Sequence, residues 1–80
     1  MILESYVVKD KKMADYGTPL FYPNKAVAVR DFQAAVKNGT IKFGEDMELY
    51  FIAKYDTESG HFVEVDSPIY IDTNAEEVQL

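Results

Sequence analysis

The chain has 80 residues, of which 14 are Asp or Glu and eight are Lys or Arg, so its formal net charge is -6. This length allows one small domain with a thin core and excludes separate substrate and cofactor domains. A hydrophobic content of 48% predicts a folded protein, and a strongly acidic chain is a poor ligand for nucleic acid through overall charge alone.

Two extended segments precede the first helix in the predicted order of elements. Residues 2–9 are rich in β-branched and aromatic side chains, which predicts a strand. Residues 14–19 contain Gly17 and Pro19 and are typical of a turn. Residues 20–22 then form a short extended piece before the next proline.

A helix of roughly 15 residues follows, and it is the clearest element in the sequence. Asn24 is a good N-cap, and Asn38 with Gly39 is a typical helix end. Apolar residues recur between them at helical spacing, which predicts an amphipathic helix lying on a sheet. The apolar stripe consists of Ala28, Val29, Phe32, Ala35 and Val36.

The C-terminal half predicts a hairpin. Residues 47–55 alternate as a strand, residues 56–60 form a loop that ends in glycine, and residues 61–66 return. In this pattern one face of the first strand holds Leu49, Phe51, Ala53 and Tyr55, and the other holds Tyr50, Ile52 and Lys54. Residues 69–71 form either an edge strand or an arm exchanged between chains.

These elements predict an α+β fold in which one amphipathic helix packs on an antiparallel sheet of three to five strands. The expected order is β-(β)-α-β-β-(β). Residues 1–72 are expected to form a single domain, and residues 73–80 an acidic, flexible tail. The chain has no cysteine, no typical signal peptide and no apolar run long enough to cross a membrane, which favours the cytoplasm.

Charge is distributed unevenly along the chain. Residues 1–54 hold eight basic and seven acidic residues, a net charge of +1, whereas residues 55–80 hold seven acidic residues and no basic one, a net charge of −7. The acidic third has two interpretations: it keeps the protein soluble, or it forms a tail that meets a partner or competes with one for the basic part.

No arrangement of residues typical of catalysis is found. His61 is the only histidine and is expected to be an ordinary surface residue, and the scattered glycines form no phosphate-binding loop. The neighbouring acidic residues are expected to be solvated loop residues, because a thin core offers no cleft for acid–base chemistry. We therefore expect no enzyme activity, no metal site and no cofactor.

Aromatic and basic residues interleave in a pattern that has two interpretations. Single-strand-binding proteins combine stacking rings with a basic groove, and the alternative is that these rings simply cover the sheet. For Arg30 the alternative is a local ion pair with Asp31 or a neighbouring residue. The candidate nucleic-acid-binding residues are Lys9, Lys11, Lys12, Tyr16, Arg30, Tyr50, Lys54 and Tyr55.

Four short motifs occur in order along the chain. They are Y-x-V-x-D over residues 6–10, P-x-F over 19–21, N-x-x-x-A-x-R-x-F over 24–32, and D-x-x-L-Y-x-I-A-x-Y-D over 46–56. This arrangement resembles the small nonstructural protein of gokushovirus-like microviruses, the tailless phages with circular single-stranded DNA. Ala53 stands where that family commonly has glycine, and residues 64–80 lie outside the resemblance.

The resemblance implies an accessory protein that acts in the infected bacterium outside the finished capsid. It suggests binding of single-stranded DNA during replication or packaging, and it directs attention to Arg30 and Tyr50. We expect a non-enzymatic homodimer in the cytoplasm of the bacterial host cell, because pairing would enlarge a thin core. The alternative is a protein-interaction module that binds a phage or host protein through a sheet edge or the acidic tail.

Overall fold

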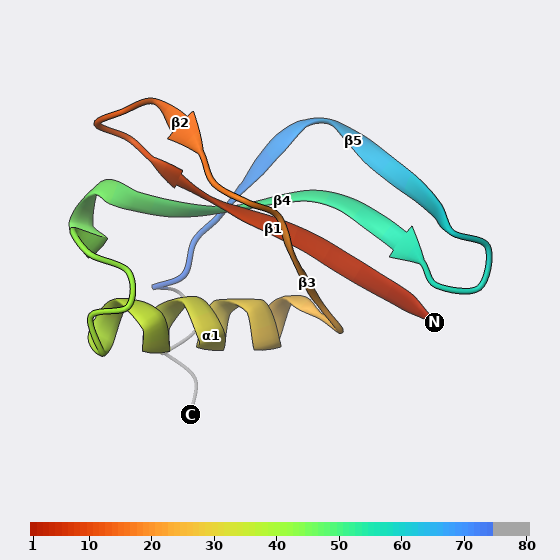
Figure 1. Ribbon diagram of the computed structural model, residues 1–80, viewed down its shortest axis with the longest axis horizontal. Helices are drawn as coiled ribbons and strands as arrows, with labels where there is room; N and C mark the ends of the chain where they lie inside the picture. The colour runs from red at the N-terminus through yellow and green to blue at the C-terminus, as the bar shows by residue number, and fades with distance from the viewer. Residues whose placement is uncertain (75–80) are drawn as a thin grey trace.

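In the computed structural model, which describes residues 1–74, one helix lies against one face of a curled, five-stranded antiparallel sheet (Figure 1). The α+β class predicted from the sequence is therefore confirmed. The elements in chain order are β1 (Ile2–Asp10), β2 (Asp15–Tyr16), β3 (Leu20–Tyr22), α1 (Lys25–Lys37), a 3₁₀ turn η1 (Gly44–Asp46), β4 (Met47–Asp56) and β5 (His61–Ile71).

Strands β1 and β4 form the centre of the sheet. They pair over their full lengths, from Ile2 opposite Asp56 to Asp10 opposite Met47. The short strands β2 and β3 share the other edge of β1, and β5 forms the far edge beside β4. One edge of the sheet is therefore completed by only two short strands, β2 with two residues and β3 with three.

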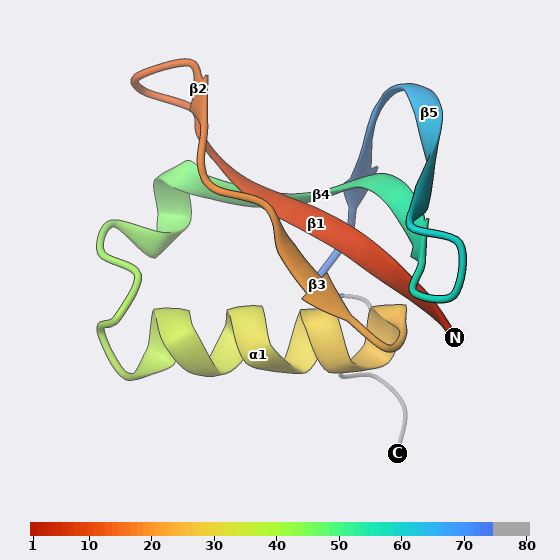
Figure 2. The same ribbon diagram turned by 45° about the vertical axis from the view of Figure 1, so that its right-hand side comes forward.

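The order of the elements differs from the predicted one. Both short strands precede α1, and the last two predicted strands are two parts of β5. Residues 61–64 pair with the end of β4 and residues 69–71 with its beginning, so residues 69–71 form an edge strand on their own chain. Between them, residues 65–68 arch away from β4 on the side opposite α1 (Figure 2). Pro68 suits the arch because it has no N–H for a strand ladder.

The predicted helix is confirmed, including both ends. The Asn24 side chain accepts a hydrogen bond from the backbone N–H of Val27 at 2.9 Å, which satisfies one of the free donors at the first turn. Asn38 is the C-cap, and Gly39 follows with a φ of 85°, a conformation that glycine adopts without strain.

The core lies between α1 and the sheet and is small. From the helix, Ala28, Val29 and Phe32 are buried, and they contact Tyr6 of β1 and Leu49 of β4. These three helix residues belong to the predicted apolar stripe. The core is one layer of side chains thick, and within residues 1–74 no helix covers the opposite face of the sheet (Figures 1 and 2).

Strand β4 contains a β-bulge at Ile52. Tyr6 of β1 pairs with Phe51, while its neighbour Ser5 pairs with Ala53, so Ile52 is an extra residue without a partner on β1. One extra residue reverses the alternation of the side chains beyond it. Leu49 and Phe51 precede the bulge and share one face as predicted, and the structure shows that this is the face that carries α1.

Beyond the bulge the predicted faces of β4 are wrong. Ala53 and Tyr55 lie on the face opposite α1, which we call the outer face, because they pair with Ser5 and Leu3. Lys54 pairs with Glu4 and is turned toward the helix side, so it does not share a face with Tyr50. The sequence around residue 52 contains no glycine or proline that would have indicated the bulge.

No helix within residues 1–74 is both long enough and apolar enough to cross a membrane. At the end of this part, the carbonyl of Thr73 accepts a hydrogen bond from the side chain of Gln33 on α1. Most of the predicted acidic tail, residues 75–80, lies outside the described residues.

Candidate nucleic-acid interface

Three tyrosines from three strands form a row across one end of the outer face. Tyr16 of β2, Tyr50 of β4 and Tyr70 of β5 have centroid separations of 5.6 and 5.8 Å and interplanar angles of 72° and 68°. Such edge-to-face contacts are the favoured geometry for neighbouring rings. We call these three residues the tyrosine row. Tyr16 is 45% exposed and Tyr70 is 51% exposed, so the rings at its two ends are accessible to a ligand.

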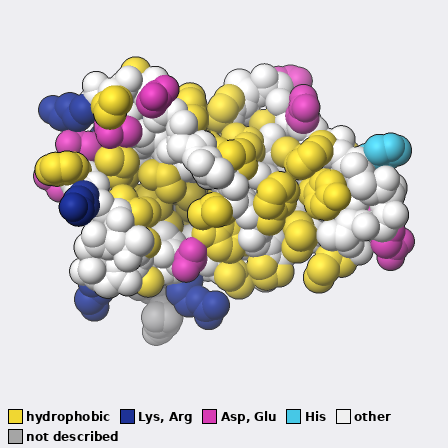
Figure 3. Space-filling view, viewed as in Figure 1, with side chains coloured by type: hydrophobic (Ala, Val, Ile, Leu, Met, Phe, Trp, Pro, Cys, Tyr) yellow, Lys and Arg dark blue, Asp and Glu magenta, His cyan; other side chains and the backbone are white. Residues whose placement is uncertain are grey.

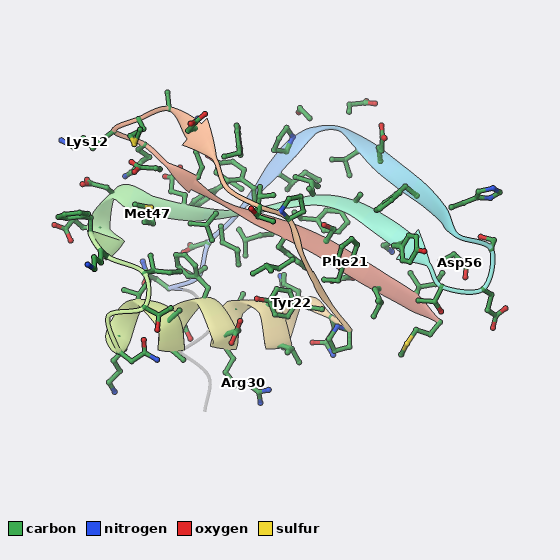
Figure 4. All side chains as sticks on the ribbon, in the orientation of Figure 1. Lys12, Phe21, Tyr22, Arg30, Met47 and Asp56 are labelled. Carbon is green, nitrogen blue, oxygen red and sulfur yellow. The ribbon has the colours of Figure 1, made fainter. Side chains whose placement is uncertain are left out.

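Basic side chains adjoin the same end of the sheet. The Lys9 ammonium lies 5.2 Å from the centre of the Tyr16 ring, within the range of a cation–π interaction. Lys11 and Lys12 follow in the exposed turn that joins β1 to β2, and Figure 4 places Lys12 at the tip of this turn. Positive charge and accessible rings therefore lie side by side here.

Glu48 links the row to this basic turn. The Tyr50 hydroxyl donates a hydrogen bond to one Glu48 oxygen at 2.8 Å, and the Lys11 ammonium lies 3.9 Å from the other. The hydrogen bond to the carboxylate, together with partial burial and the negative charge of Glu48, raises the pKa of Tyr50 to about 12. The central ring of the row is thus a neutral phenol held in a fixed position.

The titration of Tyr50 tests this arrangement. The pKa of Tyr50 is raised from 10.0 in the unfolded chain to about 12 in the folded one, so the neutral phenol stabilises the folded state. This contribution is fully present below pH 10 and is lost as the pH rises through 12. Glu48→Gln removes the carboxylate charge and is expected to return the Tyr50 pKa toward 10. Ring-carbon NMR shifts followed from pH 8 to 12 would measure it. Tyr22, whose pKa is raised to about 12 by burial and its hydrogen bond to Asp31, is the control that should not move.

The predicted site residues fall into two groups. The structure brings together Lys9, Lys11, Lys12, Tyr16 and Tyr50 at the tyrosine row. Arg30 lies on the exposed side of α1, away from the sheet, as Figure 4 shows. The local ion-pair partner considered for it, Asp31, accepts a hydrogen bond from the Tyr22 hydroxyl at 2.6 Å.

Tyr55 and Lys54 are also separated from the row. Tyr55 lies on the outer face at the opposite end, where its ring is 5.8 Å from Phe21 and 4.8 Å from Phe62. Lys54 is exposed and turned toward the helix side by the bulge. Tyr70 belongs to the row although it was not among the predicted binding residues, because only its pairing with Tyr50 across β4 and β5 places it there.

A second feature of the outer face has no signal in the sequence. A cleft of about 560 Å³ lies between the sheet and the arch of β5. We call it the arch cleft; Ser5 and Ala53 line it from the sheet, Phe21 and Phe62 provide aromatic surface, and residues 65–68 contribute the arch. Figure 3 shows hydrophobic side chains gathered over the middle and right of the molecule, the side on which the arch lies in Figure 1.

The polar groups of the arch cleft are few. Ser5 is 1% exposed, and its hydroxyl has no hydrogen-bond partner within residues 1–74. Glu64 and Asp66 contribute carboxylates, and no Lys or Arg lines the cleft in the described part of the chain. A buried hydroxyl without a partner is costly, so the cleft is suited to an occupant that is mainly apolar and supplies one hydrogen-bonding group.

Comparison with known proteins relates the chain to a family of phage proteins. A family model described as "Phage ORF5 protein" matches residues 3–78. Protein ORF5 of Chlamydia phage 1 is 32% identical over 82 residues, which cover 94% of this chain and 85% of the relative. No solved structure matches the chain.

Proposed function

Since the chain belongs to the phage ORF5 protein family, we propose that it is a non-enzymatic accessory protein that binds single-stranded DNA. Membership confirms the resemblance to a small phage protein that the four sequence motifs indicated. The proposal places the protein in the cytoplasm of the bacterial host, where single-stranded phage DNA is replicated and packaged.

The observation that supports DNA binding is the tyrosine row beside Lys9. Bases of any identity stack on aromatic rings, and basic side chains next to the rings can neutralise the phosphates. The chain as a whole is acidic, but at the end of the sheet that holds the row Lys9, Lys11 and Lys12 balance the nearby acids Asp10, Asp15 and Glu48. The overall charge therefore weakens binding without excluding it at this place.

Fluorescence anisotropy with a labelled single-stranded oligonucleotide tests the proposal. Tyr16→Ala and Tyr70→Ala are each expected to weaken binding roughly 5- to 150-fold, the equivalent of about 1–3 kcal/mol per stacked base. If all three lysines contact phosphates, the logarithm of the binding constant should fall with the logarithm of salt concentration with a slope of about −2.

Arg30→Ala is the matched control for these substitutions. Arg30 lies on the exposed side of α1, so its loss should leave the affinity within about twofold if the outer face binds the strand. A large effect of Arg30→Ala with none of Tyr16→Ala would move the interface to the helix side. No measurable binding by the wild-type chain at low salt would rule out the proposed function.

A second candidate function is a protein-interaction module, and the arch cleft is the observation that favours it. Apolar surface on the outer face and carboxylates at the cleft fit a polypeptide partner better than a phosphate-bearing one. The homodimer expected from the thin core was predicted together with DNA binding, whereas this second candidate predicts a phage or host protein as partner.

A further inference from the structure

We propose that the arch cleft binds the loop around Phe43 of a second copy of this chain, with the Phe43 ring as the anchor. Phe43 lies between α1 and η1 and is 69% exposed. Its backbone has φ 57° and ψ 48°, the left-handed conformation that a residue with a side chain adopts at a cost. The fold of its own chain gains little from this ring, because the ring lies outside the core.

The position of Phe43 is nevertheless well defined. Its carbonyl accepts a hydrogen bond from the N–H of Asp46 at 2.9 Å, which closes the 3₁₀ turn η1. An exposed aromatic ring on a strained backbone is typical of a functional position, where the strain is retained for a contact outside the local fold. Large rings that fill a pocket are also the usual anchors of protein interfaces.

The chemistry of the arch cleft matches this loop. Phe21 and Phe62 offer aromatic surface to the ring, and the loop's backbone carries hydrogen-bonding groups that can reach the unpartnered Ser5 hydroxyl. A wholly apolar ligand would leave that hydroxyl without a partner. A polypeptide loop is therefore a better occupant than a hydrocarbon or a lipid chain.

Charge favours the same loop over a nucleotide. Glu64 and Asp66 line the cleft, and they would repel the phosphate attached to any base that entered it. Lys42 immediately precedes Phe43 and is exposed, so it is the side chain of this loop that can pair with these carboxylates, whereas the acids Glu45 and Asp46 follow Phe43 in η1. Such complementarity selects a partner and orients it in the interface.

The occupant must come from another molecule. The loop before η1 lies at the left edge of the molecule in both ribbon views, whereas the arch of β5 lies above the middle in Figure 1 and at the right in Figure 2, so Phe43 cannot reach the cleft of its own chain. A two-fold pair would place each Phe43 in the cleft of the other copy and make the contact twice. The small core gives a reason for pairing, because seven hydrophobic residues are buried while eleven large ones stay exposed among the described residues.

Sedimentation velocity over a range of protein concentrations tests the contact. The wild-type chain is expected to associate, and Phe43→Gly is expected to need at least ten times more protein for the same degree of association. Phe43→Gly should also keep or raise the melting temperature, because glycine adopts φ 57° without strain. A ring with a role only in its own fold would give the reverse, a lower melting temperature.

Ala14→Gly is the matched control, since Ala14 has the same φ of 57° but offers no large side chain. It should raise the melting temperature and leave association unchanged. On the cleft side, Phe62→Ser should weaken association as Phe43→Gly does. Lys42→Glu and Asp66→Lys should each weaken association, and the double variant should recover most of it.

Three outcomes would overturn the proposal. They are a wild-type chain that stays monomeric at every concentration, a Phe43→Gly chain that associates like the wild type, and a double charge variant that is no better than the two single ones. A fall in oligonucleotide affinity when Phe62→Ser is added to Phe43→Gly would assign the cleft to a nucleobase instead. Only the last measurement uses DNA. The association experiments can therefore contradict this proposal without contradicting the proposed DNA binding, and the reverse also holds.

Discussion

Phe32→Ala is expected to remove about 3–5 kcal/mol from the free energy of unfolding, the usual cost of deleting a buried phenyl ring. Phe32 is 8% exposed and contacts both layers of the core, with Tyr6 and Leu49 on the sheet side. A chain of this size has a total stability on the order of 4–12 kcal/mol, so the substitution should remove about a quarter of it or more. Urea unfolding followed by far-UV circular dichroism would measure the change.

Phe62→Ala provides the comparison, because it deletes the same ring from the outer face, where Phe62 is 53% exposed. Its cost should be confined to the aromatic contacts with Tyr55 and Phe21, about 0.5–1.5 kcal/mol for each ring pair. Equal losses for the two substitutions would mean that the layer between α1 and the sheet is not the main source of stability.

Insertion of one residue between Ser5 and Tyr6 is expected to have the second large effect, because it gives Ile52 a partner on β1 and restores strict alternation along β4. Ala53 and Tyr55 would then turn toward the helix side, and Lys54 would turn to the outer face. Loss of the two contacts of Tyr55 with Phe21 and Phe62 should cost about 1–3 kcal/mol in total. NMR cross-peaks between the rings of Tyr55 and Phe62 should disappear, and the urea midpoint should fall.

Ile52→Val tests whether the isoleucine side chain, and not only the presence of an extra residue at position 52, is needed for the bulge. It keeps the bulge and shortens a half-buried side chain by one methyl group, so it should cost about 0.5–1.5 kcal/mol at most and preserve the Tyr55 cross-peaks. An insertion variant that retains those cross-peaks would show that the bulge had moved along the strand and that residue 52 itself does not specify it.

The bulge also positions both features of the outer face. The tyrosine row lies before it in β4, at Tyr50, and the arch cleft lies beyond it, where Ala53 lines the cleft. If Ile52 had a partner on β1, the side of the sheet that carries Tyr50 would continue with Lys54 in place of Ala53 and Tyr55. A charged side chain would then stand where the cleft needs a small one, so the bulge allows one face to carry a basic aromatic row and an apolar cleft.

The sequence by itself determined the elements whose signals are local. The helix was predicted with both ends because Asn24 caps the first turn and Asn38 with Gly39 ends the last one, and these contacts join residues only a few positions apart. The strand character of β1 and β4 and the α+β class followed from side-chain type and spacing. The family followed from four motifs in order, and the comparisons confirm it.

The tertiary structure alone decided which side chains meet. The joining of Tyr16, Tyr50 and Tyr70, and the separation of Arg30 and Lys54 from them, depend on register between strands that are distant in the chain. The buried Ser5 hydroxyl and the arch over it likewise arise from pairing across three strands. The period of a strand predicts which face a side chain lies on only while alternation is unbroken. One unpaired residue at position 52 reversed the faces of the residues after it, and no glycine or proline in the sequence indicated this.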